Sequence, residues 1–239
     1  MSLEANKYII SHKHKFIYCS VPKAGSSSVK DSILKLHLVE NRGGVSTHKI
    51  FKEEDMLIKM GDFRIRRLKR EYGDYFMFAV VRNPFSRLVS CYLNKILTLC
   101  EYTYMYNGEI SSYASFPEFI EFISGKPEKL MDPHHKPQYR FICNKAGDII
   151  PDFVGRLESF ERDYGIIYKK IGIKKPPNMP HKAPGKRTEE VIEEKRSLLE
   201  KIHGRYIDIS DYKSFYSDET REVVSEIYKK DIEIFNYKF

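Results

Sequence analysis

The sequence contains no apolar run approaching the ~20 residues that a helix needs to cross a bilayer. Its N-terminus also lacks the charged-then-apolar pattern of a secretory signal peptide. As written, the chain is therefore expected to be soluble and cytoplasmic, with no transmembrane segment. A leader or membrane anchor removed upstream of Met1 stays an open alternative.

Cysteine is scarce, and no two cysteines form a CxxC pair. Such a set does not suit a disulfide framework or a zinc ribbon, so free thiols in a reducing compartment are expected. No cluster of potential metal ligands stands out either, and no metal is expected. The four cysteines are Cys19, Cys91, Cys100 and Cys143.

Two further patterns are missing. There is no internal repeat, which argues against solenoid architectures. There is also no GxxxxGK[ST] motif, which argues against the usual nucleoside-triphosphate loop.

What is present is an ordinary globular composition of 239 residues, 41% hydrophobic and 31% charged. It predicts one domain over 1–239, with a variable helical and aromatic insertion around 99–148.

Basic residues outnumber acidic ones, 41 to 33, for a net charge of +8. This balance suggests an anionic partner. Nucleic acid, a sulfated or phosphorylated cofactor and an acidic glycan all qualify. Part of the charge gathers at the basic end of an expected helix over 53–70, where a solvated face and a site for an acidic acceptor or phosphate are equally reasonable interpretations.

The stretch 16–29 places a short apolar strand, a small-residue turn with one lysine and a helix start in immediate succession. Backbone N–H groups at such a helix start favour an anion, and the lysine adds a mobile positive charge. The serines are expected to cap the helix. The stretch therefore predicts a phosphate site, which consists of Pro22, Lys23, Ala24, Gly25, Ser26, Ser27 and Ser28.

A second junction of the same kind follows an apolar run over 75–81 that is typical of a central strand. Arg82 ends this strand, and Ser90 lies on the helix after it. In a parallel sheet both junctions lie at the C-terminal edge, where such folds bind ligands. A ligand with two separated anionic groups would fit them.

The alternation of strands and helices predicts an α/β domain with a mainly parallel central sheet flanked by helices. A strand over 8–10 is expected at the sheet edge. A proline-bracketed loop over 131–138 is expected to expose its histidines. The other expected elements are a strand at the start of the stretch 16–29, strands within 75–81 and 149–158, and helices over 26–40, 53–70, 85–96, 116–124, 159–171 and 217–234.

Two motifs in this order resemble the sulfotransferases that use 3′-phosphoadenosine 5′-phosphosulfate (PAPS). The resemblance is to their carbohydrate branch, which includes chondroitin and dermatan enzymes and bacterial relatives. Residues 21–28 (VPKAGSSS) are similar to the family's 5′-phosphosulfate loop, and residues 78–92 (FAVVRNPFSRLVSCY) to its 3′-phosphate segment. Weaker similarity covers 153–158 and 227–237. The resemblance implies a P-loop-like nucleotide-binding fold.

The resemblance also implies an in-line transfer of a sulfuryl group from PAPS to a hydroxyl, leaving the bisphosphate PAP. Lys23 would stabilise the departing phosphate, helped by loop amides. Arg82 and Ser90 would anchor the 3′-phosphate. The implied acceptor is a glycan or another small hydroxyl compound, which could be acidic, and no nucleic acid is expected. The basic loop 174–187 would fold over the nucleotide.

A base must take the acceptor's proton, and a histidine or a carboxylate suits that task near neutral pH. His48 is the first candidate, because relatives carry a histidine in a similar Ser-Thr-His setting between the two motifs. His135 is the second candidate and His134 the third. Glu53 and Glu54 stay open, since other branches of the superfamily use glutamate.

Two other functions remain alternatives. A phosphate-loop nucleotide kinase would need a lysine after the glycine and an acidic magnesium ligand, and Arg82-Asn83 stands where that ligand would be. A basic nucleic-acid-binding protein without catalysis would fit the charge and the seventeen tyrosines. Its basic residues, however, are spread along the chain rather than interleaved with aromatic ones.

Overall fold

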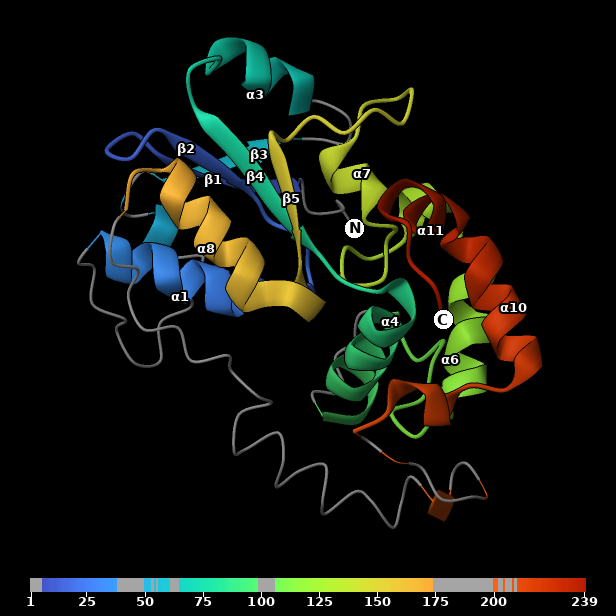
Figure 1. Cartoon of the computed structure of the whole chain (residues 1–239). Coiled ribbons are helices and arrows are strands. Elements are labelled where there is room, and N and C mark those ends of the chain that lie inside the picture. Colours follow the sequence, from blue (N-terminus) through green and yellow to red (C-terminus); the bar gives the residue numbers. More distant parts are fainter. Residues whose placement is uncertain are drawn as a thin grey trace. The chain divides into compact units, whose positions relative to one another are not determined.

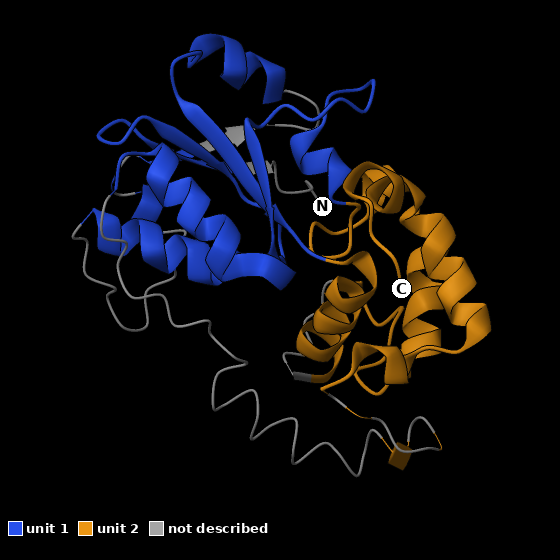
Figure 2. Cartoon of the chain, viewed as in Figure 1, with its two compact units in different colours: residues 1–82, 138–181 blue, residues 83–137, 182–239 orange. Residues whose placement is uncertain are grey.

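A computed structural model describes the chain in two compact units, which are treated separately here (Figure 2). Unit 1 consists of residues 1–82 and 138–181, and unit 2 of residues 83–137 and 182–239. The residues that the structure describes are 6–37, 50–52, 54, 56–60, 65–98, 106–173, 200–201, 204, 208 and 210–239.

A five-stranded sheet in the order β3-β1-β2-β4-β5 forms the centre of unit 1 (Figure 1). The strand β2 pairs in parallel with β4, and β4 pairs in parallel with β5. The strand β1 runs antiparallel to both of its neighbours. The bounds are β1 Asn6–Ser11, β2 Phe16–Cys19, β3 Leu57–Met60, β4 Phe76–Val81 and β5 Phe153–Arg156.

Helices α1 (Ser26–Leu36) and α8 (Phe160–Lys170) cover one face of this sheet, and their apolar stripes share a core with the strands. On the other face, the hydroxyl of Tyr8 donates to the carbonyl of Phe141 in the short helix α7 (Tyr139–Ile142). Because both faces are covered, β2 and β4 are buried almost throughout. The predicted α/β class with a mainly parallel sheet flanked by helices is confirmed.

Two expectations about the first third of the chain are wrong. The strand expected over 8–10 is not at the edge, because β3 pairs with its outer side. The helix expected over 53–70 is instead the strand β3 followed by the short helix α3 (Ile65–Glu71). Pairing with β1 overrides the helical spacing of the apolar residues, a long-range effect that local spacing does not reveal.

Unit 2 is helical, and its aromatic core joins segments from both ends of its sequence. Ring pairs such as Tyr92 with Phe116, at 5.3 Å between centroids, fill this core. Ser115 caps α6 and Ser217 caps α10, each in a capping box. The elements are α4 Pro84–Tyr92, a π-helix Leu93–Thr98, α6 Phe116–Ser124, 3-10 turns Glu128–Leu130 and Tyr212–Phe215, α10 Asp218–Ile227 and α11 Lys229–Phe235.

In the part of the chain that the structure describes, no helix combines the length and apolar character needed to span a membrane. Nor do three or more His, Cys, Asp or Glu side chains within it group in a way that could hold a metal ion.

Candidate functional site

The turn between β2 and α1 contains two residues in the left-handed region. Lys23 has φ 64° and Gly25 has φ 75°. Glycine adopts this conformation without strain, whereas for lysine it costs about 1–2 kcal/mol. A methyl group added at Gly25 would also lie 2.7 Å from Leu157 Cδ1. The turn is therefore a specific backbone shape at the C-terminal end of β2.

The first turn of α1 begins directly after Gly25, which is the N-cap residue and provides no side-chain cap. The prediction that a serine caps this helix is therefore wrong. Ser26, Ser27 and Ser28 instead form the first turn, which has no acidic residue. The N–H groups of such a turn have no carbonyl partner within their own helix, so they carry partial positive charge that suits an anion.

Arg82 follows β4, and a buried glutamine fixes its backbone. The N–H of Arg82 donates to Gln138 Oε1 at 2.9 Å, and Gln138 Nε2 donates to the Arg82 carbonyl at 2.7 Å. This reciprocal pair continues the strand's hydrogen bonding beyond Val81. Gln138 is fully buried, and the sequence analysis assigned it no role. Its place directly after Pro137 was the only local signal.

The side chain of Arg82 reaches the lysine turn. Its Nη1 atom lies 3.5 Å from the carbonyl oxygen of Lys23, a long hydrogen bond. Two junctions 59 residues apart in sequence, one after β2 and one after β4, therefore meet at the same edge of the sheet. The structure brings together the expected phosphosulfate loop and the expected 3′-phosphate arginine.

Ser90, the other residue expected at the 3′-phosphate, is half-buried in α4 of unit 2. The start of α4 is well fixed. The Asn83 side chain caps it by accepting from the N–H of Phe85 at 3.0 Å, and the Asn83 amide donates to the carbonyl of Lys238 at 2.7 Å. The role of Ser90 stays a prediction.

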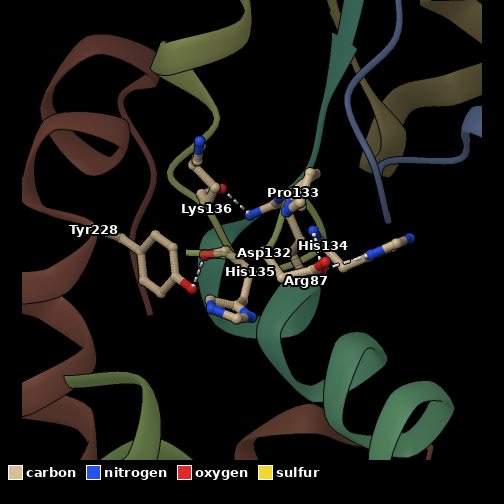
Figure 3. A network of polar contacts seen from close by, with 7 residues as sticks. All are labelled: Arg87, Asp132, Pro133, His134, His135, Lys136 and Tyr228. Atoms are coloured by element: carbon tan, nitrogen blue, oxygen red, sulfur yellow. Dashed lines mark hydrogen bonds and ion pairs between the residues drawn. The ribbon is translucent and has the colours of Figure 1, made fainter. Parts of the chain in front are cut away.

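The histidine loop over 131–137 is anchored by a buried arginine (Figure 3). Arg87 on α4 is 1% exposed and donates to the carbonyls of Lys136 at 2.9 Å and Pro133 at 3.2 Å. From the other side, the hydroxyl of Tyr228 donates to the carbonyl of His135 at 2.6 Å. Arg87 lies within the second quoted motif, but no role was predicted for it.

The expectation that this loop exposes its histidines is wrong for His135. Its side chain is fully buried and lies edge-on to Phe119, with ring centroids 6.3 Å apart. Burial lowers the pKa of His135 to about 3, and the nearby Arg87 adds to this effect. A buried imidazole that stays neutral near pH 7 and contacts an aromatic ring is typical of a structural residue rather than of a proton acceptor for a substrate.

His134 differs from its neighbour. Its side chain is 34% exposed, and its Nδ1 atom lies 2.7 Å from Asp132 Oδ1. The same carboxylate oxygen accepts from the backbone N–H of His134 at 2.9 Å. A carboxylate on Nδ1 fixes the ring and its tautomer, so that Nε2 is the ring nitrogen without the proton. His48, Glu53 and the loop 174–187 lie outside the described residues, whereas Glu54 is exposed.

Replacing Arg87 by methionine is expected to lower the free energy of unfolding by about 2–4 kcal/mol, because two buried carbonyls lose a charged donor. Urea denaturation measures this loss. Arg87→Lys keeps the charge but cannot span two carbonyls, so it should recover only part of the stability. Wild-type stability in Arg87→Met would contradict the anchoring role.

Burial of His135 predicts a pH dependence of stability. The pKa falls from 6.5 to about 3 in the folded chain, so below pH 6.5 the unfolded chain binds a proton that the folded chain does not. The free energy of unfolding should then fall by about 1.4 kcal/mol per pH unit as the pH drops from 6.5 toward 3. Between pH 7 and pH 5, the wild type should lose about 2 kcal/mol more than His135→Leu in urea denaturation. Equal losses of unfolding free energy in the wild type and His135→Leu would show that His135 binds a proton in the folded chain as readily as in the unfolded chain, which would contradict its burial.

Comparison with known proteins places these features in a family. The model of a family described as "Sulfotransferase family" matches residues 6–238. Carbohydrate sulfotransferase 14 of Mus musculus is 27% identical over 184 residues, which cover 72% of this chain and 47% of that protein. Carbohydrate sulfotransferase 9 of Homo sapiens is 23% identical over 248 residues, covering 97% and 53%. Carbohydrate sulfotransferase 10 of Homo sapiens is 24% identical over 206 residues, covering 75% and 56%.

This chain therefore spans about half the length of its relatives. No solved structure matches it. The family match covers nearly the whole chain, including both junctions described above, and confirms the resemblance seen in their residues. The chain belongs to the sulfotransferase family.

Proposed function

We propose that the chain transfers a sulfuryl group from PAPS to a hydroxyl group of a carbohydrate. The observation that carries the proposal is the meeting of Arg82 with the Lys23 turn at the edge of the sheet, beside the first turn of α1. The names of the relatives support the carbohydrate as acceptor. The family match also favours a sulfotransferase over a nucleotide kinase or a non-catalytic nucleic-acid binder.

The residues at this edge suit a nucleotide with two anionic ends. The turn offers a lysine and the amides of a helix start without an acidic residue, which fits a 5′-phosphosulfate. Arg82 offers a guanidinium on a fixed backbone, which fits a phosphate through a fork of hydrogen bonds. When bound, PAPS supplies the sulfuryl group that passes to the acceptor oxygen.

In this proposal the chain contributes charge and position. Lys23 and the amides of the first turn of α1 stabilise negative charge on the departing 5′-phosphate. Arg82 holds the 3′-phosphate and so fixes the nucleotide along the sheet edge, and a role for Ser90 at this phosphate stays a prediction from the sequence. Pro22, Ala24 and Gly25 shape the turn. The acceptor's proton passes to a base, for which His48 is our first candidate.

His134 replaces His135 as the second candidate for the base. Asp132 orients its ring, and its side chain is partly exposed, whereas the ring of His135 is buried. Loss of the base should lower the rate of transfer by about 10²–10⁴-fold. Comparing His48→Ala with His134→Ala, each with its pH–rate profile, assigns the role to the variant that loses both rate and the acidic limb of the profile, on which the rate rises as the base loses its proton.

The direct test is transfer of labelled sulfuryl from PAPS to a panel of glycans. We expect a labelled product and stoichiometric PAP with at least one glycan. A thermal shift with PAP provides a second readout that needs no acceptor, because a ligand bound only by the folded chain raises its stability. The absence of both a labelled product and a thermal shift at millimolar nucleotide would overturn the proposal.

A further inference from the structure

A basic surface on the short helix α3 is left unexplained by the transfer site. Ile65 and Leu68 are buried, so the remaining side chains of α3 face outward. The basic side chains among them border a hollow of about 510 Å³ at the surface of unit 1. We call this the α3 basic surface; its lining residues are Arg66, Arg67, Lys69, Arg70, Ile149 and Ile150.

The charge of this surface is only partly balanced. Arg67 pairs with Glu71 at 2.6 Å, and Lys69 with Asp152 at 2.5 Å. Within the described part of the chain, no carboxylate forms an ion pair with Arg66 or Arg70. These two lie one helical turn apart on the same face, where like charges repel. A bound anion would relieve that repulsion.

The floor of the surface is apolar and rigidly held. Ile149 is 43% exposed, although exposed isoleucine is costly. The turn before it is fixed by Asn144, whose Oδ1 accepts from the N–H groups of Ala146 at 2.9 Å and Asp148 at 3.0 Å. An isolated antiparallel β-bridge between the backbones of Cys143 and Ile149 closes the turn. The isoleucines are therefore presented beside the arginines in a fixed position.

The α3 basic surface lies away from the transfer site. The helix α3 precedes β4, and Ile150 precedes β5, so both lie where these parallel strands begin (Figure 1). The Lys23 turn and Arg82 lie where the strands end. Six residues of β4 separate the two edges, or about 20 Å at the rise of a strand. A small acceptor bound for transfer would not touch α3.

Cations around an apolar floor fit an acidic polysaccharide. Carboxylate or sulfate groups would pair with Arg66 and Arg70, and the CH faces of sugar rings would pack on the isoleucines. Single-stranded nucleic acid fits less well, because it is typically held by aromatic side chains that stack on bases, and the lining has none.

We propose that the α3 basic surface binds an extended acidic glycan at a distance from the transfer site. The choice of a glycan rests on the proposed function, whereas the anionic character of the ligand rests on the surface itself. A long chain could occupy this surface while another part of it lies at the transfer site, so binding should depend on chain length.

The test measures the Kd of fluorescent chondroitin sulfate chains for the whole 239-residue chain by anisotropy. Arg66→Gln combined with Arg70→Gln should weaken binding by about tenfold or more. The number of counterions released on binding, read from the slope of log Kd against log salt concentration, should fall by about two. The matched control is Lys169→Gln with Lys170→Gln, which removes the same charge from exposed lysines of α8. The control should change Kd by less than about twofold. Carboxyl-reduced, desulfated chains should not bind.

Three results would overturn the proposal. Equal weakening in both double variants would show attraction to net charge alone. Unchanged binding in Arg66→Gln/Arg70→Gln would place the glycan elsewhere. Tighter binding of a single-stranded oligonucleotide, lost in the same variant, would make the ligand a nucleic acid. The thermal shift with PAP is measured separately, so failure of the proposed function would be seen there and not in the anisotropy.

Discussion

Replacing Lys23 by alanine is expected to lower the rate of sulfuryl transfer by about 10²–10³-fold, the range seen when one group that stabilises transition-state charge is removed. The free energy of unfolding should change by less than about 1 kcal/mol, because the lysine is not part of the core. The measurement is kcat with saturating PAPS and an acceptor found in the glycan panel, alongside urea denaturation.

The matched control for this variant is Lys35→Ala, which removes an exposed lysine from the last turn of α1, the helix that follows the Lys23 turn. It should keep wild-type turnover. Lys23→Arg keeps a positive charge at the turn and should recover part of the rate. Undiminished turnover in Lys23→Ala would refute the role assigned to this residue.

Replacing Arg82 by alanine is expected to weaken the binding of PAP by about 2–2.7 kcal/mol, or about 30- to 100-fold in Kd, because hydrogen bonds to a charged phosphate are lost. The strand end should persist, since Gln138 bonds the backbone of Arg82 and not its side chain. Isothermal titration calorimetry measures the Kd.

Arg82→Lys tests the geometry of the contact. A lysine keeps the charge but lacks the planar fork, so about half of the lost binding energy should return. Arg162→Ala, which removes an arginine with a 70% exposed side chain from α8, is the control and should bind PAP as the wild type does. Equal affinities of Arg82→Ala and wild type would show that the arginine does not contact the nucleotide.

The strand–turn–helix order around Lys23 was predictable because its signals are local. A strand, a glycine, a lysine and a helix start follow one another within residues 16–29, and parallel strands bring their carboxyl ends to one edge. The meeting of Arg82 with Lys23 follows from that rule. The left-handed conformation of Lys23 does not, because nothing in its neighbours requires it.

Long-range effects set the limits of the sequence analysis. Local apolar spacing favours a helix through 57–60, but β1 offers these residues a strand partner. Prolines around the histidine loop favour exposure, but Arg87 and Tyr228 bind its carbonyls and hold His135 inside. Both outcomes depend on residues far away in sequence, which no local pattern identifies.

The most direct test of the two-ended nucleotide site compares the binding of PAP and adenosine 5′-phosphate to the wild-type chain by calorimetry. The two ligands differ only in the 3′-phosphate, which Arg82 is proposed to hold. We expect PAP to bind about 30- to 100-fold more tightly. Equal affinities, or no binding of either nucleotide, would contradict the account.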